Sequence, residues 1–381
     1  MNRLQFEILK FLSGNLGRAY TIREIADGLK AHYSLVFNNT KKLEKEGLLL
    51  SETIGKSSSI SLNFESDLLI TALSELELNE KASLIRDIPR LRRLFTELEI
   101  YFGGISEIMS PPRGYYCIDS IAIIEPRRNI KANRAELLFL MREPNATGGF
   151  GRIESRKELE KILDEEIKSL YSLKIPLRET MKQELNLRID YLALKTGEFY
   201  NLLGSGERNP LREMLSDKVA IAGPQDFWLA IWRALQRKRL PVSSQAPLSP
   251  LKISEKDLAY NLDRLGYREM GTAAGEGEKI CPESMIISAL LKGDKRRIEA
   301  IPVIISKRIG ADKPLNYRLL IFLAEKYGKA GQLLGLLEAL QGITPNEDLK
   351  GAIGLLKGLE IKEEKADSAA IKQKMRIYNA G

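Results

Sequence analysis

The sequence predicts an α+β protein of several domains: helices and a small hairpin at the N-terminus, a mixed α/β domain in the middle and an all-α helical bundle at the C-terminus. Three observations lead to this prediction. The 381 residues are enough for two or three domains. Apolar runs typical of strands are concentrated between residues 115 and 235. From residue 282 onward, apolar residues recur at helical spacing between glycines and prolines.

We predict five segments from these patterns. They are an N-terminal domain over residues 1–65, a helical connector over 66–114, the mixed α/β domain over 115–240, linker and loops over 241–281, and the helical domain over 282–381. The 44% of apolar and 29% of charged residues are typical of a globular chain. No apolar run approaches the roughly 20 residues that a membrane span needs. Arg3, Glu7 and Lys10 interrupt the first apolar stretch, which is not a signal-peptide pattern, so we expect a cytoplasmic protein with no membrane partner.

Histidine and cysteine are too scarce for several kinds of site. With one histidine, His32, the chain cannot build a zinc site on several histidines, and we expect His32 to be a turn residue. Cys117 and Cys281 lie too far apart in sequence to suggest a disulfide framework or a thiolate cluster. The net charge of +8 favours a polyanionic partner, although solubility alone also explains such a charge.

The first 63 residues predict three helices and a hairpin. The helices are expected over residues 3–13, 22–29 and 33–46, the second opened by a capping box of Thr21 and Glu24 and the third closed by Gly47. Two short strands, residues 48–50 and 60–62, flank a polar tip at residues 55–58.

This order of elements resembles a winged helix-turn-helix domain. Residues 34–48, SLVFNNTKKLEKEGL, carry the likeness best, because they resemble the recognition helix and glycine-leucine exit of many prokaryotic regulators. The resemblance covers about a sixth of the chain. It implies that the third helix enters the major groove of double-stranded DNA.

The third helix has an inner and an outer face. Val36, Thr40 and Leu43 recur at i, i+4 and i+7 and are expected in the core. The expected DNA-binding residues are Tyr33, Ser34, Phe37, Asn38, Lys41 and Lys42 on this helix and Lys56 at the hairpin tip. Asn38 would bind an adenine edge, Phe37 a thymine methyl group, and the lysines phosphates. Residues 1–63 contain nine Lys and Arg against six Asp and Glu, a mild net charge of +3, so a domain that contacts only protein stays an alternative.

The middle of the chain alternates helical and strand-like patterns. Residues 67–99 are helical in pattern, and strands are expected over 118–124, 135–141 and 188–194, with a helix over 156–170. The order of these elements, with Asn209-Pro210-Leu211 and the run from Val219 to Trp228, resembles the small nucleotidyltransferase domains of the polymerase-beta superfamily. Such domains often follow a winged helix in archaeal and bacterial proteins.

That resemblance implies a Gly-Ser turn that binds phosphates and three aspartates that bind two magnesium ions. Here the turn falls on Glu125-Pro126, and the expected Asp-x-Asp falls on Arg134-Ala135-Glu136. Only Asp190 lies where the third carboxylate belongs. In a second register, Gly103-Gly104 is the phosphate-binding turn and Cys117-Ile118-Asp119 takes the place of the Asp-x-Asp pair. This register also lacks one aspartate.

We therefore expect a domain that has kept the fold and lost the activity, with no metal and no cofactor. Glu136, Asp190 and Asp119 are the degenerate catalytic candidates. The alternative for all three is a structural role as strand-end carboxylates, paired with Arg127, Arg128, Lys131 and Arg134. The glycine cluster at residues 148–151 is expected to be a loop, not a phosphate-binding loop.

The C-terminal third predicts helices and no chemistry. Residues 241–250 are typical of an exposed linker. Helices are expected over residues 283–292, 295–307, 317–327, 331–340 and 346–359, followed by a charged tail.

Taken together, these resemblances predict a DNA-binding protein, a transcriptional regulator with a degenerate nucleotidyltransferase-like domain. The resemblance to winged-helix regulators also favours a homodimer, because such proteins commonly bind two half-sites. Two alternatives stay open. One is an active Mg²⁺-dependent nucleotidyltransferase that acts on a protein or RNA acceptor, and the other is a protein-interaction scaffold.

Overall fold

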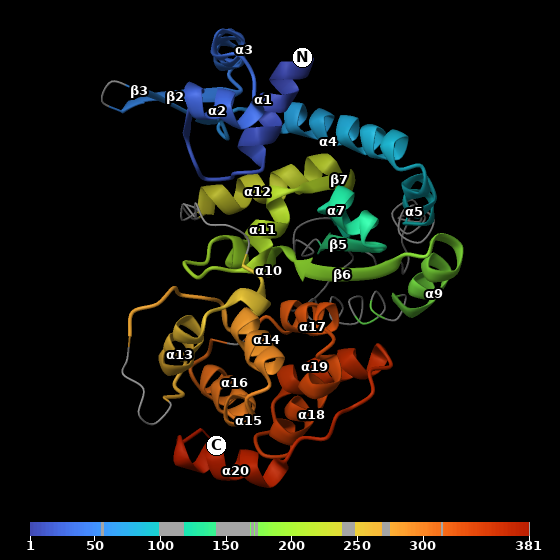
Figure 1. Ribbon diagram of the computed structural model, residues 1–381, viewed down its shortest axis with the longest axis vertical. Coiled ribbons are helices and arrows are strands. Elements are labelled where there is room, and N and C mark those ends of the chain that lie inside the picture. The colour runs from blue at the N-terminus through green and yellow to red at the C-terminus, as the bar shows by residue number, and fades with distance from the viewer. Residues whose placement is uncertain are drawn as a thin grey trace, which may run out of the picture. The chain divides into compact units, whose positions relative to one another are not determined.

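The computed structural model describes residues 1–54, 57–98, 118–141, 168, 171, 174–237, 248–268, 275–313 and 315–380. The described part is mixed α/β and mostly helical, with two small sheets (Figure 1). The chain divides into two compact units. Unit 1 comprises Met1–Pro144, Leu194–Ser205 and Leu211–Ala246, and unit 2 comprises Asn145–Ala193, Gly206–Pro210 and Pro247–Gly381.

Unit 1 begins with three helices and a three-stranded antiparallel sheet. The helices are α1 (Arg3–Ser13), α2 (Ile22–Leu29) and α3 (Tyr33–Lys45), and the sheet has the order β1-β3-β2, from Tyr20–Thr21, Ser57–Leu62 and Leu49–Ile54. These bounds confirm the three predicted helices and the predicted hairpin. Local signals explain the agreement: Thr21 and Glu24 form the expected capping box. Gly47 also takes the left-handed conformation, with φ of +76°, after α3.

The predicted helical stretch over residues 67–99 is two helices in its described part. These are α4 (Asp67–Asp87) and α5 (Arg90–Leu98), separated by Ile88 and Pro89. Proline disfavours the helical conformation for the residue before it, and Ile88 accordingly leaves the helical region, with φ of −135° and ψ of 80°. Within unit 1, α4 packs on α12 (Pro224–Arg237) and on strand β7 (Lys218–Ala222).

The second sheet has the strand order β6-β5-β4-β7. Strands β4 (Ile118–Ile124), β5 (Arg134–Met141) and β6 (Arg188–Lys195) confirm the three predicted strands to within a residue at each end. Strand β4 pairs antiparallel with both β5 and β7. The long burial patterns of β4 and β5 explain why the sequence shows continuous apolar runs instead of alternation.

Short helices connect these strands. They are α7 (Pro126–Lys131), α10 (Thr196–Leu203) and α11 (Pro210–Ser216). The predicted run from Val219 to Trp228 is β7, a turn and the start of α12. Gly223 in that turn has φ of +56°, and a Cβ there would lie 2.0 Å from the carbonyl oxygen of Asp119, so only glycine fits.

The described remainder of unit 2 is helical apart from part of β6. Its helices are α9 (Lys174–Leu185), α13 (Glu255–Arg264), α14 (Pro282–Lys292), α15 (Lys295–Ile298), α16 (Ile301–Gly310), α17 (Tyr317–Lys326), α18 (Ala330–Gln341), α19 (Glu347–Gly358) and α20 (Ser368–Ile377), with a 3₁₀ turn at Pro250–Lys252. Helices α14, α17, α18 and α19 follow the predicted ranges closely. Together they confirm the expectation of helices from residue 282 onward.

Three segments of unit 2 differ from the sequence predictions. The helix expected over 295–307 is two helices, α15 and α16, and Pro302 lies in the first turn of the second. The expected charged tail contains α20, which buries Ile371 and Met375. Helix α13, capped by Ser254, lies within the stretch expected to be linker and loops.

Several predictions lie outside the described residues. These are the helix over 156–170 apart from residue 168, the exposed linker over 241–247, and the glycines at 103–104 and 148–151. Among the described residues, no helix combines the length and the apolar character that a membrane crossing requires.

Candidate functional site

Helix α3 is held in place by a narrow buried stripe. Val36, Thr40 and Leu43 are fully buried, as the spacing predicts, and α3 packs through them on α1, α2 and strand β2. The buried hydroxyl of Thr40 has no hydrogen-bond partner in the described part of the chain. Most of the remaining surface of α3 is exposed to solvent.

The outer face of α3 presents the expected side chains to solvent. Tyr33, Ser34, Phe37, Asn38, Lys41 and Lys42 are all exposed. The rings of Tyr33 and Phe37 are stacked, with 6.1 Å between centroids and 29° between planes. Because Tyr33 is 54% and Phe37 38% exposed, this aromatic pair covers a surface and does not fill a core.

Two neighbouring asparagines on α3 have different surroundings. The Nδ2 of Asn39 donates to the carbonyl oxygen of Leu35 at 2.8 Å, and its Oδ1 accepts from the Nδ2 of Asn2 at 2.9 Å. Asn38 is exposed, and its amide has no partner among the residues that the structure describes. Asn39 therefore supports the fold, while the amide of Asn38 is available to an external ligand.

The lysines of α3 also differ from one another. The ammonium group of Lys41 lies 2.7 Å from a carboxylate oxygen of Glu44, one turn further along the helix. Lys42 and Lys45 have no ion pair within the described ranges. Of the two predicted lysines that the structure describes, Lys42 is thus the one whose charge is not already compensated.

Two further residues of α3 were not predicted as part of the site. Lys45 follows Lys41 by one helical turn, so its spacing could have placed it on the same side. Leu35 is 52% exposed, although its apolar side chain is typical of a core position. Lys56 lies outside the described residues, so the structure does not place its side chain.

The turn before α3 orients that helix. Lys30 ends α2 in the left-handed conformation, with φ of 52°, and His32 precedes α3 without a side-chain cap. His32 is exposed, as expected of a turn residue. The backbone N–H groups of the first turn of α3 carry the positive end of the helix dipole, which favours an anion there.

The degenerate catalytic candidates lie on three strands and are engaged within the fold. Glu136 on β5 is buried, with a carboxylate oxygen 3.5 Å from the guanidinium of Arg134. Asp119 on β4 is half-buried, and its carbonyl oxygen lies against Gly223.

Asp190 on β6 belongs to a charge cluster of unit 2. It is fully buried and lies 2.9 Å from Arg178 and 3.1 Å from Arg188, and Arg178 also pairs with Glu325 at 2.9 Å. Its partners therefore differ from the basic residues expected from the sequence, because Arg178 reaches it from α9 and links it to Glu325 on α17. Among the described residues, no three His, Cys, Asp or Glu side chains are grouped as a metal site requires.

The turn at Glu125-Pro126 has no backbone N–H group left for a ligand. Glu125 takes the left-handed conformation, with φ of 41°, and its N–H donates to the carbonyl oxygen of Asp217 at 2.6 Å. Pro126 has no N–H. These two residues therefore offer no backbone donor to a phosphate.

No protein family, curated protein or solved structure matches this chain, so the assignment of a function rests on the residues described above.

Proposed function

We propose that residues 1–65 form a winged helix-turn-helix domain that binds double-stranded DNA, and that the chain is a transcriptional regulator. The observation that supports this most strongly is the outer face of α3. It combines an amide without a partner in the described chain, Asn38, with an uncompensated cation, Lys42, and an exposed aromatic pair. A major groove admits one α-helix, and α3 follows a tight turn as a recognition helix does.

Each group on this face has a chemical counterpart in DNA. The amide of Asn38 can both donate to and accept from the major-groove edge of adenine. The ring of Phe37 suits the methyl group of thymine. Lys41, Lys42 and Lys45 suit phosphates, with Lys41 exchanging its exposed pair with Glu44 for a phosphate at little cost, because exposed pairs contribute only about 0–1 kcal/mol.

We further propose that the central part is a nucleotidyltransferase-like domain without catalytic activity. Three observations support this proposal. The Glu125 N–H is already bonded to Asp217, an arginine, Arg134, stands where the resemblance implies a ligand carboxylate, and Asp190 is neutralised by two guanidinium groups. A homodimer that binds two half-sites is the assembly that a winged helix favours.

The DNA proposal is tested by a double variant, Lys41→Ala with Lys42→Ala. A duplex is first selected from a random library with the purified chain, and its affinity is then measured by fluorescence anisotropy at several salt concentrations. Loss of two phosphate contacts should weaken binding and make the slope of log affinity against log salt shallower by up to about 2. Preference among sequences should change little, because phosphate contacts carry no sequence information.

The matched control is the double variant Lys365→Ala with Lys372→Ala. Both lysines are exposed, and both lie in unit 2, so the control removes the same charge from the chain elsewhere. An equal change in the control would show that only total charge matters. An unchanged salt slope in the α3 variant, with thermal unfolding near wild type, would show that α3 does not lie on DNA.

A protein-interaction scaffold is the second candidate, and one observation favours it. Tyr33, Leu35 and Phe37 expose more apolar surface than phosphate binding requires. A partner protein held through this face would be lost on Leu35→Lys, whereas DNA would bind that variant at least as tightly because a cation is added.

A further inference from the structure

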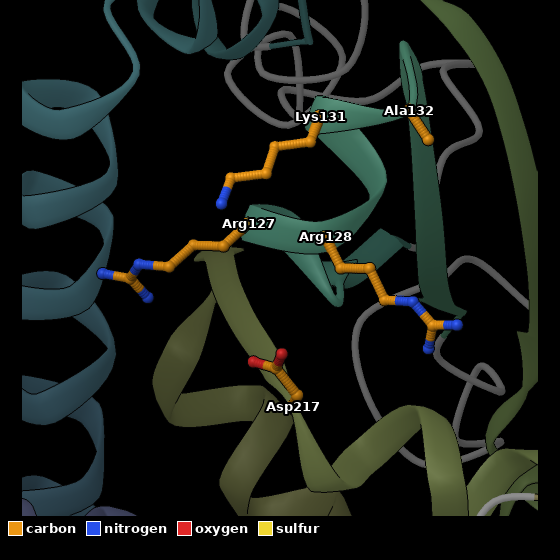
Figure 2. Close-up of a pocket in the computed structure, with 5 residues that line it drawn as sticks. All are labelled: Arg127, Arg128, Lys131, Ala132 and Asp217. Atoms are coloured by element: carbon orange, nitrogen blue, oxygen red, sulfur yellow. The ribbon is translucent and has the colours of Figure 1, made fainter.

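Unit 1 contains an open pocket between α7 and the residue that precedes β7. Its volume is about 570 Å³, and it is lined by Arg127, Arg128, Lys131, Ala132 and Asp217 (Figure 2). Such a volume falls in the range of roughly 300–1,000 Å³ that is usual for small-molecule sites. Three of the five lining residues are cations, and neither the α3 surface nor the degenerate carboxylates include any of them.

The cations follow from the sequence of α7. Arg127, Arg128 and Lys131 lie at i, i+1 and i+4 of a six-residue helix that begins with Pro126. Figure 2 shows Arg127 and Lys131 extending on the same side, toward α4, while Arg128 extends in the opposite direction. Since Pro126 has no N–H, an anion in this pocket would be bound by side chains and not by the end of the helix.

Lys131 is the cation without compensation. It is exposed and has no hydrogen bond or ion pair within the part of the chain that the structure describes. Arg127 lies 3.5 Å from Glu80 and 3.4 Å from Asp87, and its side chain is 44% exposed. An exposed pair of this kind contributes little to stability, so Arg127 can turn to a more highly charged anion with little loss.

Arg128 and Asp217 complete the pocket. Arg128 lies 3.2 Å from both carboxylate oxygens of Glu125 and is 77% exposed, so its pair is also weak. The carboxylate of Asp217 points into the space below α7 and has no side-chain partner among the described residues (Figure 2). A carboxylate in this place repels a bare anion but accepts a hydrogen bond from a hydroxyl group.

We propose that this pocket binds a small phosphorylated molecule that also carries hydroxyl groups. Its phosphate lies against Lys131 and Arg127, and a hydroxyl group of the same molecule donates to Asp217. Binding needs no magnesium, because protein cations compensate the phosphate. The proposal does not rest on DNA binding; in a regulator, such a ligand would act as an effector.

The test is titration calorimetry of the full chain without Mg²⁺, with ribose 5-phosphate, ribose, inorganic phosphate and sulfate as probes. Ribose 5-phosphate should bind saturably and more tightly than inorganic phosphate or sulfate, and ribose should not bind. Lys131→Gln should weaken ribose 5-phosphate binding about tenfold or more, the usual scale for one charge-assisted contact. Lys372→Gln, the same change at an exposed lysine in unit 2, should leave it unchanged.

The variant Asp217→Asn distinguishes the contribution of the ligand's hydroxyl group to binding from that of its phosphate. It should weaken the binding of ribose 5-phosphate relative to that of inorganic phosphate, because only the sugar phosphate has a sugar hydroxyl to donate. Circular dichroism and thermal unfolding verify that the variants are folded, as expected for substitutions of side chains that line an open pocket.

Three outcomes would overturn the proposal. The first is no saturable binding of any phosphate-bearing probe up to about 10 mM, well above a dissociation constant of about 1 mM, which is weak for a small-molecule site. The second is equal weakening by Lys131→Gln and Lys372→Gln, which would show a general effect of charge. The third is loss of duplex DNA affinity in Lys131→Gln when no small probe binds, which would assign these cations to a nucleic-acid surface instead.

Discussion

At the scale of single residues, α3 shows how one helix separates support from recognition. Asn38 and Asn39 are adjacent and chemically identical, yet Asn39 is bonded to Asn2 and to the backbone of Leu35. Only their positions around the helix axis distinguish them. The same separation holds for Lys41, paired with Glu44, and Lys42, which has no ion pair in the described chain.

Asn38→Ala should relax sequence preference at one base pair by about 1–3 kcal/mol, because one two-point contact to adenine is removed. The salt slope should stay unchanged, since no phosphate contact is lost. Competition assays with single-base variants of the selected duplex measure the preference. Asn39→Ala is the matched control and should lower stability without altering base preference; the opposite assignment of effects would contradict the role given to Asn38.

Thr40→Val should stabilise the protein by about 1 kcal/mol. The buried hydroxyl of Thr40 has no partner in the described part of the chain, and valine fills the same shape without a polar atom. Urea unfolding followed by circular dichroism measures the change. Thr71→Val on the exposed face of α4 should change stability by less than about 0.5 kcal/mol. Destabilisation by Thr40→Val would mean that the hydroxyl is bonded in solution.

At the scale of elements, structure that local signals determine could be predicted from the sequence, whereas structure that depends on long-range contacts could not. The capping box at Thr21 and the stripe of Val36, Thr40 and Leu43 both lie within one helix, so the sequence alone predicts them. Helix α20 was not predicted because Ile371 and Met375 are its only buried residues in a charged stretch, and they are buried by packing on other helices. The break before α16 could have been predicted from Pro302.

The candidate sites divide in the same way. Exposure of the α3 residues follows from helical periodicity and was predictable. The pairing of Asp190 with Arg178 was not predictable, because Arg178 comes from a separate helix, α9, and also pairs with Glu325 on α17. The pocket at α7 depends on the approach of Asp217, which no local pattern indicates.

The capping box predicts a pH dependence at the start of α2. Hydrogen bonds from the Thr21 backbone and hydroxyl, aided by the Arg18 guanidinium, lower the pKa of Glu24 in the folded state. A lowered pKa stabilises the fold above the pKa of the unfolded chain, and this contribution is lost as pH falls through the folded value. The effect should be small, because the Glu24 side chain is 47% exposed.

The stability difference between the wild type and Glu24→Gln measures this contribution, because glutamine keeps the capping bonds but does not titrate. The difference should be constant between about pH 7 and pH 5 and should shrink below about pH 4, near the ordinary range for glutamate. Glu46→Gln, at an exposed carboxylate, controls for net charge. A difference that grows as the pH falls would mean that the fold favours the protonated form of Glu24, which contradicts a lowered pKa.

At the scale of the whole molecule, buried charges act as supports between elements. In unit 1, Glu77 on α4 pairs with Lys218 on β7 and accepts from the backbone N–H of Ala220 at 2.8 Å. In unit 2, Asp190 and Glu325 share Arg178. Removal of one member of such a pair leaves a buried charge uncompensated and destabilises the fold. These carboxylates therefore have a structural role.

Because the candidate catalytic carboxylates Asp190 and Glu136 are paired with arginines, we expect the chain to bind no pair of magnesium ions and to transfer no nucleotide. Two magnesium ions need several carboxylates that face one another, whereas Asp190 faces two guanidinium groups and Glu136 lies beside Arg134. Calorimetry with a nucleoside triphosphate should therefore show no binding whose stoichiometry depends on Mg²⁺. Incubation with labelled nucleotide, Mg²⁺ and protein or RNA acceptors should transfer no label.

Magnesium-dependent transfer that Glu136→Gln abolishes, in a variant that still unfolds cooperatively, would show an active nucleotidyltransferase. Phosphate binding at the α7 pocket would persist in that variant, because Lys131 and Arg127 bind the phosphate without a metal.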